Sequence, residues 1–205
     1  MASLSDLNAA PFDCPTLQHL NVDPSTIDTV SPLEITNKWF SAFEASISSE
    51  DLNSLIPLFH EHGFWKDILT LTWDMRTIRG HPSIRQLLDA RLALTGLSVF
   101  HLIADALRGP TIVKPLSDVV FIRFCFTFET KHGKGIAVAF LVPASNGTWE
   151  AWSLLTRLDS LKGHPEKVSR SSYRLHAAIC NADPSDWRFA SPILTPRKLG
   201  ERASA

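Results

Sequence analysis

Residues 118–130 read DVVFIRFCFTFET, and this stretch decides the fold class. Apolar side chains stand at every second position: Val120, Ile122, Phe124, Phe126 and Phe128. Phe121, Arg123, Cys125, Thr127 and Glu129 alternate with them and form a mixed set. Because successive side chains of a strand point to opposite faces, the pattern predicts a long strand with one apolar face. Such a strand suits a sheet that packs a core on one side and a pocket or a partner on the other.

Three further segments also favour strands: residues 97–107, 134–143 and 148–160. They are divided by turns rich in Gly, Pro, Asn or Lys, and KHGKG and PASNG have the character of hairpin connections. The second half of the chain is therefore predicted to be an antiparallel meander.

The preceding segments favour helices. Ser31-Pro32-Leu33-Glu34 forms a capping box, after which Ile35, Trp39, Phe43 and Ile47 recur every four residues. A second helix is expected from Ser49 to about Phe59, with its last turn distorted by Pro57. His81-Pro82 opens a third helix, which Gly96 would end. Helices first and strands afterwards predict an α+β domain, in which three N-terminal helices pack on a curved antiparallel sheet.

The length and composition favour one domain with extensions. A chain of 205 residues with 44% hydrophobic residues can bury one substantial core. Residues 1–30 are interpreted as an N-terminal arm and 31–160 as the domain. Residues 161–205 lose the periodicity and are expected to form a tail that docks on the domain through Trp187 and Phe189.

The charge pattern constrains the partners. The formal net charge is −1 and no basic run stands out, so we expect neither nucleic acid nor a membrane surface as a partner. The N-terminus has no signal-like pattern and no stretch approaches the ~20 apolar residues that span a bilayer, which favours a cytoplasmic location. Cys14, Cys125 and Cys180 lack CxxC spacing, so neither a disulfide framework nor a thiolate zinc site is expected. A hydrophobic small molecule is the favoured partner.

Two stretches carry a family resemblance: LFHEHGFWKDILTLTWDMRTIRG at 58–80 and NGTWEAWSLLTRLDSLKGHPEK at 146–167. Both look like the N-terminal cone domain of flavin-dependent monooxygenases of microbial secondary metabolism. That domain belongs to the nuclear transport factor 2-like superfamily, with the SnoaL-like cyclases, scytalone dehydratase and ketosteroid isomerase. The resemblance covers roughly residues 33–168 and implies a cone fold. The glycines form no GxGxxG cluster, so neither a flavin-binding domain nor a cofactor is expected in this chain.

Four residues are candidates for chemistry. Asp67 and Asp74 lie near Trp65 and Trp73, and an apolar surrounding raises the pKa of a carboxyl group toward the range useful for acid–base catalysis. The alternative is that Asp67 pairs with a nearby cation and that Asp74 caps a turn. His101 could line the cone or be a hydrogen-bonded sheet residue. Arg123 could orient a substrate carboxylate or pair across the strands.

Aromatic residues are the candidates for substrate binding, although such residues more often form a core. They are Trp39, Phe43, Phe59, Phe64, Trp65, Trp73, Phe100, Phe121 and Trp152. His60 and His62 could attract a metal, but no further ligands stand at convincing spacing, so we predict no metal site.

Three functions are compatible with these features. The favoured one is a cofactor-independent cyclase or isomerase that folds a terpenoid or polyketide intermediate in an apolar pocket, for example for a Diels–Alder type closure. The second is a dehydratase or epoxide hydrolase that uses Asp67 and Asp74. The third is a non-catalytic binding module, or a homodimer formed through the outer sheet face, and a pocket filled by side chains would favour it.

Overall fold

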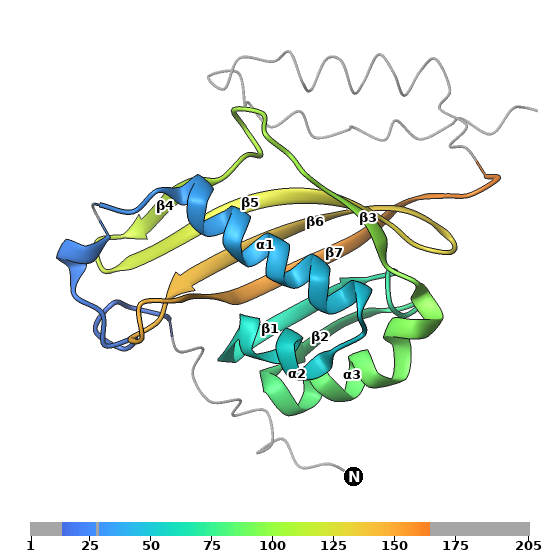
Figure 1. Cartoon of the computed structure of the whole chain (residues 1–205), viewed down its shortest axis with the longest axis horizontal. Coiled ribbons are helices and arrows are strands. Elements are labelled where there is room, and N and C mark those ends of the chain that lie inside the picture. Colours follow the sequence, from blue (N-terminus) through green and yellow to red (C-terminus); the bar gives the residue numbers. More distant parts are fainter. Residues whose placement is uncertain (1–13, 28, 165–205) are drawn as a thin grey trace, which may run out of the picture. The chain divides into compact units, whose positions relative to one another are not determined.

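The computed structural model describes residues 14–27 and 29–164 (Figure 1). The predicted tail with Trp187 and Phe189, and residues 1–13 of the predicted arm, lie outside this part of the chain. In the described residues the helices are α1 (Pro32–Ser48), α2 (Leu52–Leu55) and α3 (Gly80–Thr95), with short 3-10 turns at Pro24–Thr26 and Ile56–Leu58. The strands are β1 (Phe59–Ile68), β2 (Met75–Arg79), β3 (Ser98–Leu102), β4 (Thr111–Leu116), β5 (Val119–Glu129), β6 (Gly133–Pro143) and β7 (Trp149–Leu161).

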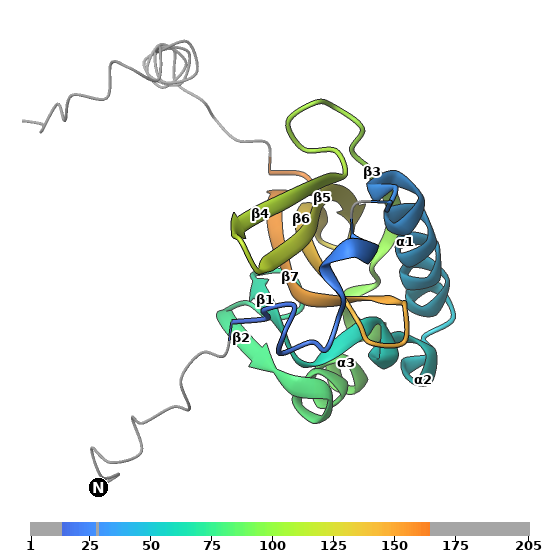
Figure 2. The same cartoon turned by 90° about the vertical axis from the view of Figure 1, so that its left-hand side faces the viewer.

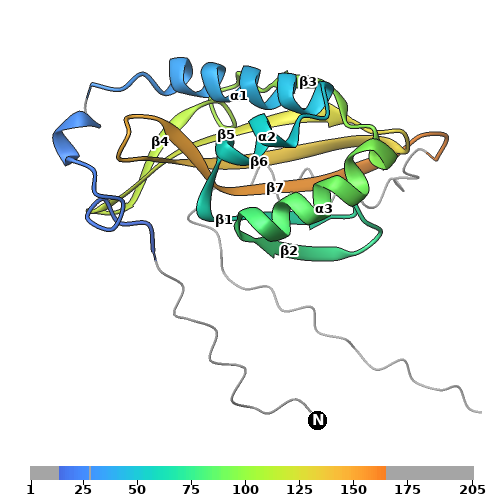
Figure 3. The ribbon, with the colours of Figure 1, turned by 60° about the horizontal axis from the view of Figure 1, so that its bottom comes forward.

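The strands form one curved sheet in the order β2-β1-β7-β6-β5-β3, and β4 also pairs with β5. The helices cover one face of it: α1 packs on β3, β4, β5 and β7, and α3 packs on β1 and β2 (Figures 2 and 3). The predicted α+β architecture of helices on a curved sheet is confirmed. β5, β6 and β7 form the predicted antiparallel meander, whereas β1 pairs with β7 in parallel, which the sequence did not indicate.

The alternation in β5 determines which side of the sheet forms the core. Phe124, Phe126 and Phe128 are buried against the helices, and their neighbours lie on the outer face of the sheet. The buried side chains of α1 are on the face that meets these phenylalanines. Apolar residues recur at every second position in β5 and at about every fourth position in α1. Both sets of side chains therefore meet in one shared apolar layer.

The predicted ends of the two long helices are confirmed. The Ser31 hydroxyl accepts a hydrogen bond from the Glu34 amide at 3.4 Å, as a capping box requires. Gly96 ends α3 in the left-handed conformation, with φ of 63°, and its amide donates to the Leu92 carbonyl at 3.0 Å. None of the helices in the described ranges is both long and apolar enough to cross a bilayer.

The second predicted helix is much shorter than expected. α2 has four residues, Pro57 lies in a 3-10 turn, and β1 already begins at Phe59. Gly63, expected to precede the strand, lies inside β1 where the pairing with β7 shifts register. A β-carbon there would lie 2.6 Å from the Ala151 carbonyl oxygen and 2.9 Å from that of His60. The glycine therefore allows the close approach of β1 and β7.

Substituting Gly63 with alanine is expected to lower the free energy of unfolding by about 2 kcal/mol, because both neighbouring atoms belong to the backbone and cannot rotate away. Urea denaturation followed by tryptophan fluorescence measures the change. An unaltered transition midpoint would contradict the close approach.

Strand β4 was not predicted, because its residues fall in the connection between the predicted strands 97–107 and 118–130. It contains Pro115. In the structure β4 pairs only with β5, so it is an edge strand. A proline is tolerated on an edge because its missing N–H removes no ladder hydrogen bond from a second neighbour.

Candidate functional site

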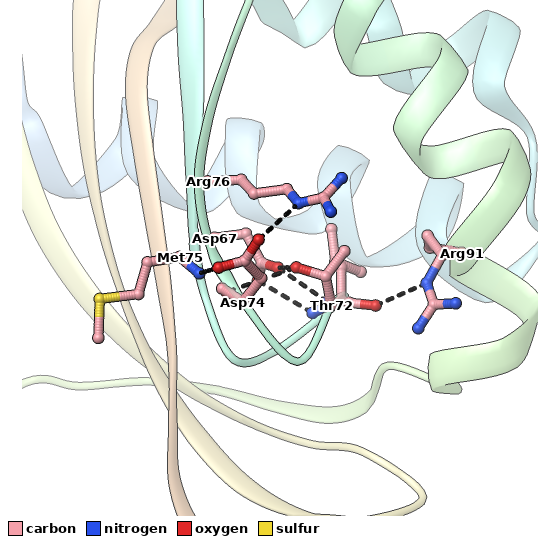
Figure 4. Close-up of polar contacts among 7 residues, drawn as sticks. Asp67, Thr72, Asp74, Met75, Arg76 and Arg91 are labelled. Atoms are coloured by element: carbon pink, nitrogen blue, oxygen red, sulfur yellow. Dashed lines mark hydrogen bonds and ion pairs between the residues drawn. The ribbon is translucent and has the colours of Figure 1, made fainter.

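Asp67 organises the turn between β1 and β2. Its side chain is fully buried, and one carboxylate oxygen accepts from the amides of Thr70 at 3.0 Å and Leu71 at 2.9 Å. The other oxygen accepts from the Thr72 amide at 2.8 Å and the Thr72 hydroxyl at 2.7 Å (Figure 4). Four hydrogen bonds occupy the acceptor positions of the carboxylate, and among residues 14–27 and 29–164 it forms no ion pair of the kind considered as an alternative. This geometry favours a structural role for Asp67.

Asp74 and Arg91 complete the same turn from its exposed side. The Asp74 carboxylate accepts from the Met75 amide at 2.8 Å and from Arg76 Nε at 3.3 Å, as the turn interpretation expected. Arg91 of α3 donates from Nε to the Leu71 carbonyl at 2.8 Å (Figure 4). Asp74 is exposed, so it has no apolar surrounding that would adapt it to acid–base catalysis.

His101 and Arg123 lie on the other face of the sheet. His101 pairs with Thr127 and is exposed on the outer face, away from the helices. Arg123 also belongs to the outer face, where it donates from Nη2 to the Leu107 carbonyl at 2.7 Å. Because Asp67 faces the core and three strands separate β1 from β3, the structure does not bring these candidates together. This position favours the interpretation of His101 as a sheet residue over one in which it lines the cone interior.

The aromatic side chains predicted to line a pocket fill the interior instead. Trp39 stacks on Phe43 with ring centroids 5.0 Å apart, and Phe59 stacks on Trp65 at 5.7 Å. Phe43 also meets Phe100 edge-on at 5.8 Å. The indole N–H groups find acceptors within the protein, Leu58 O for Trp39 and Thr156 Oγ1 for Trp65, both at 2.9 Å. These rings lie in the core, a position that does not favour their predicted role in substrate binding, although Trp39 and Phe59 also border the cavities described next.

The other four predicted binding residues lie away from this interior. Phe64 is on the opposite side of β1 from Trp65, and Phe121 packs edge-on with Phe140 on the outer face. Trp73 is 61% exposed in the β1–β2 turn, with its ring 5.4 Å from that of His132. Trp152 is buried next to His60, at 5.1 Å, outside the main core cluster. Strand alternation accounts for the positions of Phe64 and Phe121, and a register shift in β7 falls at Trp152.

Two cavities adjoin at one end of the domain, where α1 begins and β6 turns into β7. The apolar cavity, of about 380 Å³, is bordered by Ile35, Lys38, Trp39, Ala42, Pro57, Leu58, Asn146, Gly147, Thr148, Trp149 and Glu150. The histidine cavity, of about 480 Å³, is bordered by His19, Leu20, Asn21, Pro57, Phe59, His60, Glu61, His81, Ala144, Ser145, Asn146 and Glu150. Glu150, Pro57 and Asn146 border both, so a ligand in the first cavity can approach the polar groups of the second.

Glu150 is the acidic group shared by the two cavities. It lies near the start of β7, paired with Val142 of β6. Burial raises the pKa of the Glu150 carboxyl group above the ordinary value of 4.5, while His81 opposes the change and Glu61 adds to it. A carboxyl group that keeps its proton to a higher pH than usual is suited to act as a general acid.

His60 and His81 supply oriented imidazoles in the histidine cavity. His60 Nδ1 accepts from the His62 amide at 3.2 Å, which leaves Nε2 as the protonated nitrogen of the neutral ring. Burial is the main cause that lowers the pKa of His60 below 6.5, and the charge of His62 contributes in the same direction. His81 Nε2 lies 2.7 Å from the Phe59 carbonyl, to which it donates as the protonated nitrogen. The cavity therefore brings together Glu150, whose pKa is raised, and His60, whose pKa is lowered, so in both groups burial favours the uncharged form.

Sequence reasoning passed over this group of residues. Glu150 lies between two tryptophans in TWEAW. This acid among the aromatic residues of a predicted strand is the sequence feature that could have identified it as a site residue. His60 was considered only as a metal ligand. Within residues 14–27 and 29–164, no group of three His, Cys, Asp or Glu side chains is placed to hold a metal ion.

Comparisons with known proteins give likenesses of fold. No protein-family model and no curated protein matches the chain. Similar solved structures include a ketosteroid isomerase-like protein from Erwinia carotovora atroseptica, 11% identical with a TM-score of 0.47, covering 63% of this chain and 98% of that one. ActVI-ORFA from Streptomyces coelicolor is 10% identical with a TM-score of 0.47, covering 62% and 96%. Nuclear transport factor 2 from Cryptosporidium parvum is 14% identical with a TM-score of 0.43, covering 62% and 93%. Structures of the predicted superfamily are thus among those similar to this chain.

Proposed function

We propose that the chain is a cofactor-independent cyclase or isomerase that acts on a hydrophobic intermediate of the terpenoid or polyketide class in the cytoplasm. The observation that carries the proposal is Glu150, a half-buried carboxyl group that borders both an apolar cavity and a histidine-lined one. The apolar cavity would hold the carbon skeleton between Trp39 and Trp149. Glu150 would then protonate or polarise a carbonyl or alkene at the boundary.

The geometry gives each part of this site a defined task. Ile35, Leu58 and the two tryptophans offer apolar contact, which favours a folded rather than an extended chain in a cavity of about 380 Å³. Holding the reacting ends together lowers the entropic part of the barrier without a covalent intermediate. His60 and His81 border the histidine cavity together with Glu150, and in this proposal they would take up its proton.

The test is incubation of the full chain with a panel of linear polyene and terpenoid precursors, with product ratios determined by mass spectrometry. We expect cyclised or isomerised products to form faster than with heat-denatured protein. The variant Glu150→Gln should reduce this rate about 100-fold, as expected when a general acid is lost. Glu44→Gln is the matched control, because Glu44 is also half-buried, on α1, and borders neither cavity. Equal rates for E150Q and E44Q would overturn the assignment of Glu150.

The pH dependence gives a separate prediction. Since burial raises the pKa of Glu150, the protonated form persists above pH 4.5, and activity should fall as the pH rises through this raised pKa. The titratable groups that act on Glu150 are His81 and Glu61, and Lys38 borders the apolar cavity. Glu61→Gln removes the negative charge that adds to the raised pKa of Glu150, so the alkaline limb should move to lower pH. A rate profile recorded from pH 4 to 9 shows the limb, and its presence in E150Q would contradict the prediction.

A second function is favoured by the filled interior. The aromatic rings of the core pack against one another and fill the space where a deep active-site pocket would lie. A filled interior supports the non-catalytic module. On the outer face, Phe121, Val138 and Phe140 are half-exposed and apolar, so this module would act as a homodimer through that face. Light scattering of the full chain separates the two proposals: a dimer without turnover of any precursor supports the module.

A further inference from the structure

A groove with basic walls runs between β2 and α3, at a distance from Glu150 and sharing no residue with its cavities. Its volume is about 880 Å³, within the range of small-molecule sites. Two arginines border it from opposite sides, Arg76 from β2 and Arg91 from α3, against one acid, Asp74. Arg79 also borders it, but it pairs with Phe64 in the β1–β2 ladder and so projects to the opposite face of β2. This local excess of positive charge contrasts with the net charge of −1 for the whole chain.

The groove also has an apolar floor. Ile78 pairs with the buried Trp65 across β1 and β2, so it points to the face of β2 that turns toward α3. Arg76 pairs with Asp67 in the same ladder and therefore projects to the same face. Leu87 and Ala90 border the groove from α3. Flat apolar contact between charged walls suits a ligand with a planar body and an anionic group.

Arg91 is held in place as an anchor on the helix side. Its Nε donates to the Leu71 carbonyl at 2.8 Å, and this bond leaves the two terminal nitrogens of the guanidinium for another acceptor. Arg76 is tied less firmly, to Asp74 at 3.3 Å. Figure 4 shows both arginines beside Thr72 of the turn. A guanidinium group can donate two parallel hydrogen bonds to one anion. Two such groups on opposite walls can therefore bind an anion with three or more oxygens, such as a phosphate.

Trp73 supplies the aromatic surface at the same site. It borders the groove, its side chain is 61% exposed, and the neighbouring turn is fixed by the four hydrogen bonds of Asp67. An exposed indole on a rigid turn offers a stacking platform for a planar ring. We propose that the groove between β2 and α3 binds a small organic phosphate with an aromatic ring, of the nucleoside monophosphate class, with the phosphate on Arg76 and Arg91 and the base on Trp73.

The test is calorimetric titration of the full chain with adenosine monophosphate, inorganic phosphate and adenosine. We expect adenosine monophosphate to bind about tenfold or more tightly than either fragment, because only the nucleotide engages both the arginines and Trp73. Equal affinity for adenosine and the nucleotide would overturn the role of the arginines. Equal affinity for inorganic phosphate and the nucleotide would overturn the role of Trp73. No binding of the nucleotide at millimolar concentration would overturn the site.

Variants localise the binding. Arg76→Gln should weaken nucleotide affinity about tenfold, and Trp73→Ala should reduce it to that of inorganic phosphate. Arg157→Gln is the matched control, because Arg157 is a similarly exposed strand arginine that pairs with an aspartate two residues away, Asp159, at 2.6 Å on the outer face. Equal weakening by R76Q and R157Q would show nonspecific charge attraction and overturn the proposal.

Discussion

Replacing Asp67 with alanine is expected to lower the free energy of unfolding by about 3–4 kcal/mol. The substitution removes the acceptor of three backbone amides and one hydroxyl, and the amides of Thr70 and Leu71 are buried. Removing an N–H group from water costs free energy, and a hydrogen bond to a protein acceptor offsets this cost. A buried N–H without an acceptor therefore destabilises the folded state. Chemical denaturation followed by tryptophan fluorescence measures the change.

Two further variants test whether the loss of stability comes from the hydrogen bonds of the Asp67 carboxylate. Asp67→Asn keeps one oxygen for Thr70 and Leu71 but presents an N–H₂ group to the Thr72 amide, so it should lose an intermediate amount, about 2 kcal/mol. Asp74→Asn is the control, because Asp74 is exposed and its pair with Arg76 is a surface contact worth at most about 1 kcal/mol. If D67A were no less stable than D74N, the turn would not depend on the carboxylate.

The structural role of Asp67 also bears on the proton chemistry first considered for it. A carboxylate whose oxygens already accept four hydrogen bonds would have to release the turn before it could take a proton from a substrate. The dehydratase alternative based on Asp67 and Asp74 therefore has less support than a site at Glu150. Glu150 borders two cavities and has no such network among the residues that the structure describes.

Local sequence patterns determined the parts of the fold that depend on neighbours in the chain. The alternation of Phe124, Phe126 and Phe128 fixed the inner face of β5, and Ser31 and Gly96 fixed helix ends, because caps and periodicity act within a few residues. The parallel pairing of β1 with β7 joins residues about 90 positions apart, as in the Trp65–Thr156 hydrogen bond. No local pattern encodes such a pairing.

The candidate site was harder to predict for the same reason. The burial of Glu150 depends on α1, the β6–β7 turn and the residues around His60 meeting at one end of the sheet. Asp67, in contrast, was chosen as a candidate because it lies near tryptophans in the sequence. Its carboxylate instead accepts hydrogen bonds from backbone amides three to five residues later in the chain. An acid next to aromatic residues in sequence thus fits a turn scaffold as well as a catalytic group.

Replacing Phe43 with alanine is expected to lower the free energy of unfolding by about 4 kcal/mol, within the range for large-to-small core substitutions. Phe43 is 1% exposed and its ring meets those of Trp39, Trp65, Phe100 and Phe126 at centroid distances of 5.0–6.2 Å. Removing it leaves a void lined by aromatic rings that are held from both the helix and the sheet. Leu94→Ala, at a residue 60% exposed on α3, is the control and should change stability by less than about 0.5 kcal/mol.

The same variant tests whether the interior of the domain is filled. An apolar cavity left by a large-to-small substitution binds small apolar molecules such as benzene. Benzene should therefore raise the melting temperature of Phe43→Ala and leave that of the unsubstituted chain unchanged, because binding to the folded state alone is stabilising. An equal rise in both proteins would mean that the unsubstituted interior already holds an apolar pocket. The substrate would then be expected among Phe43, Trp65 and Phe100 instead of beside Glu150.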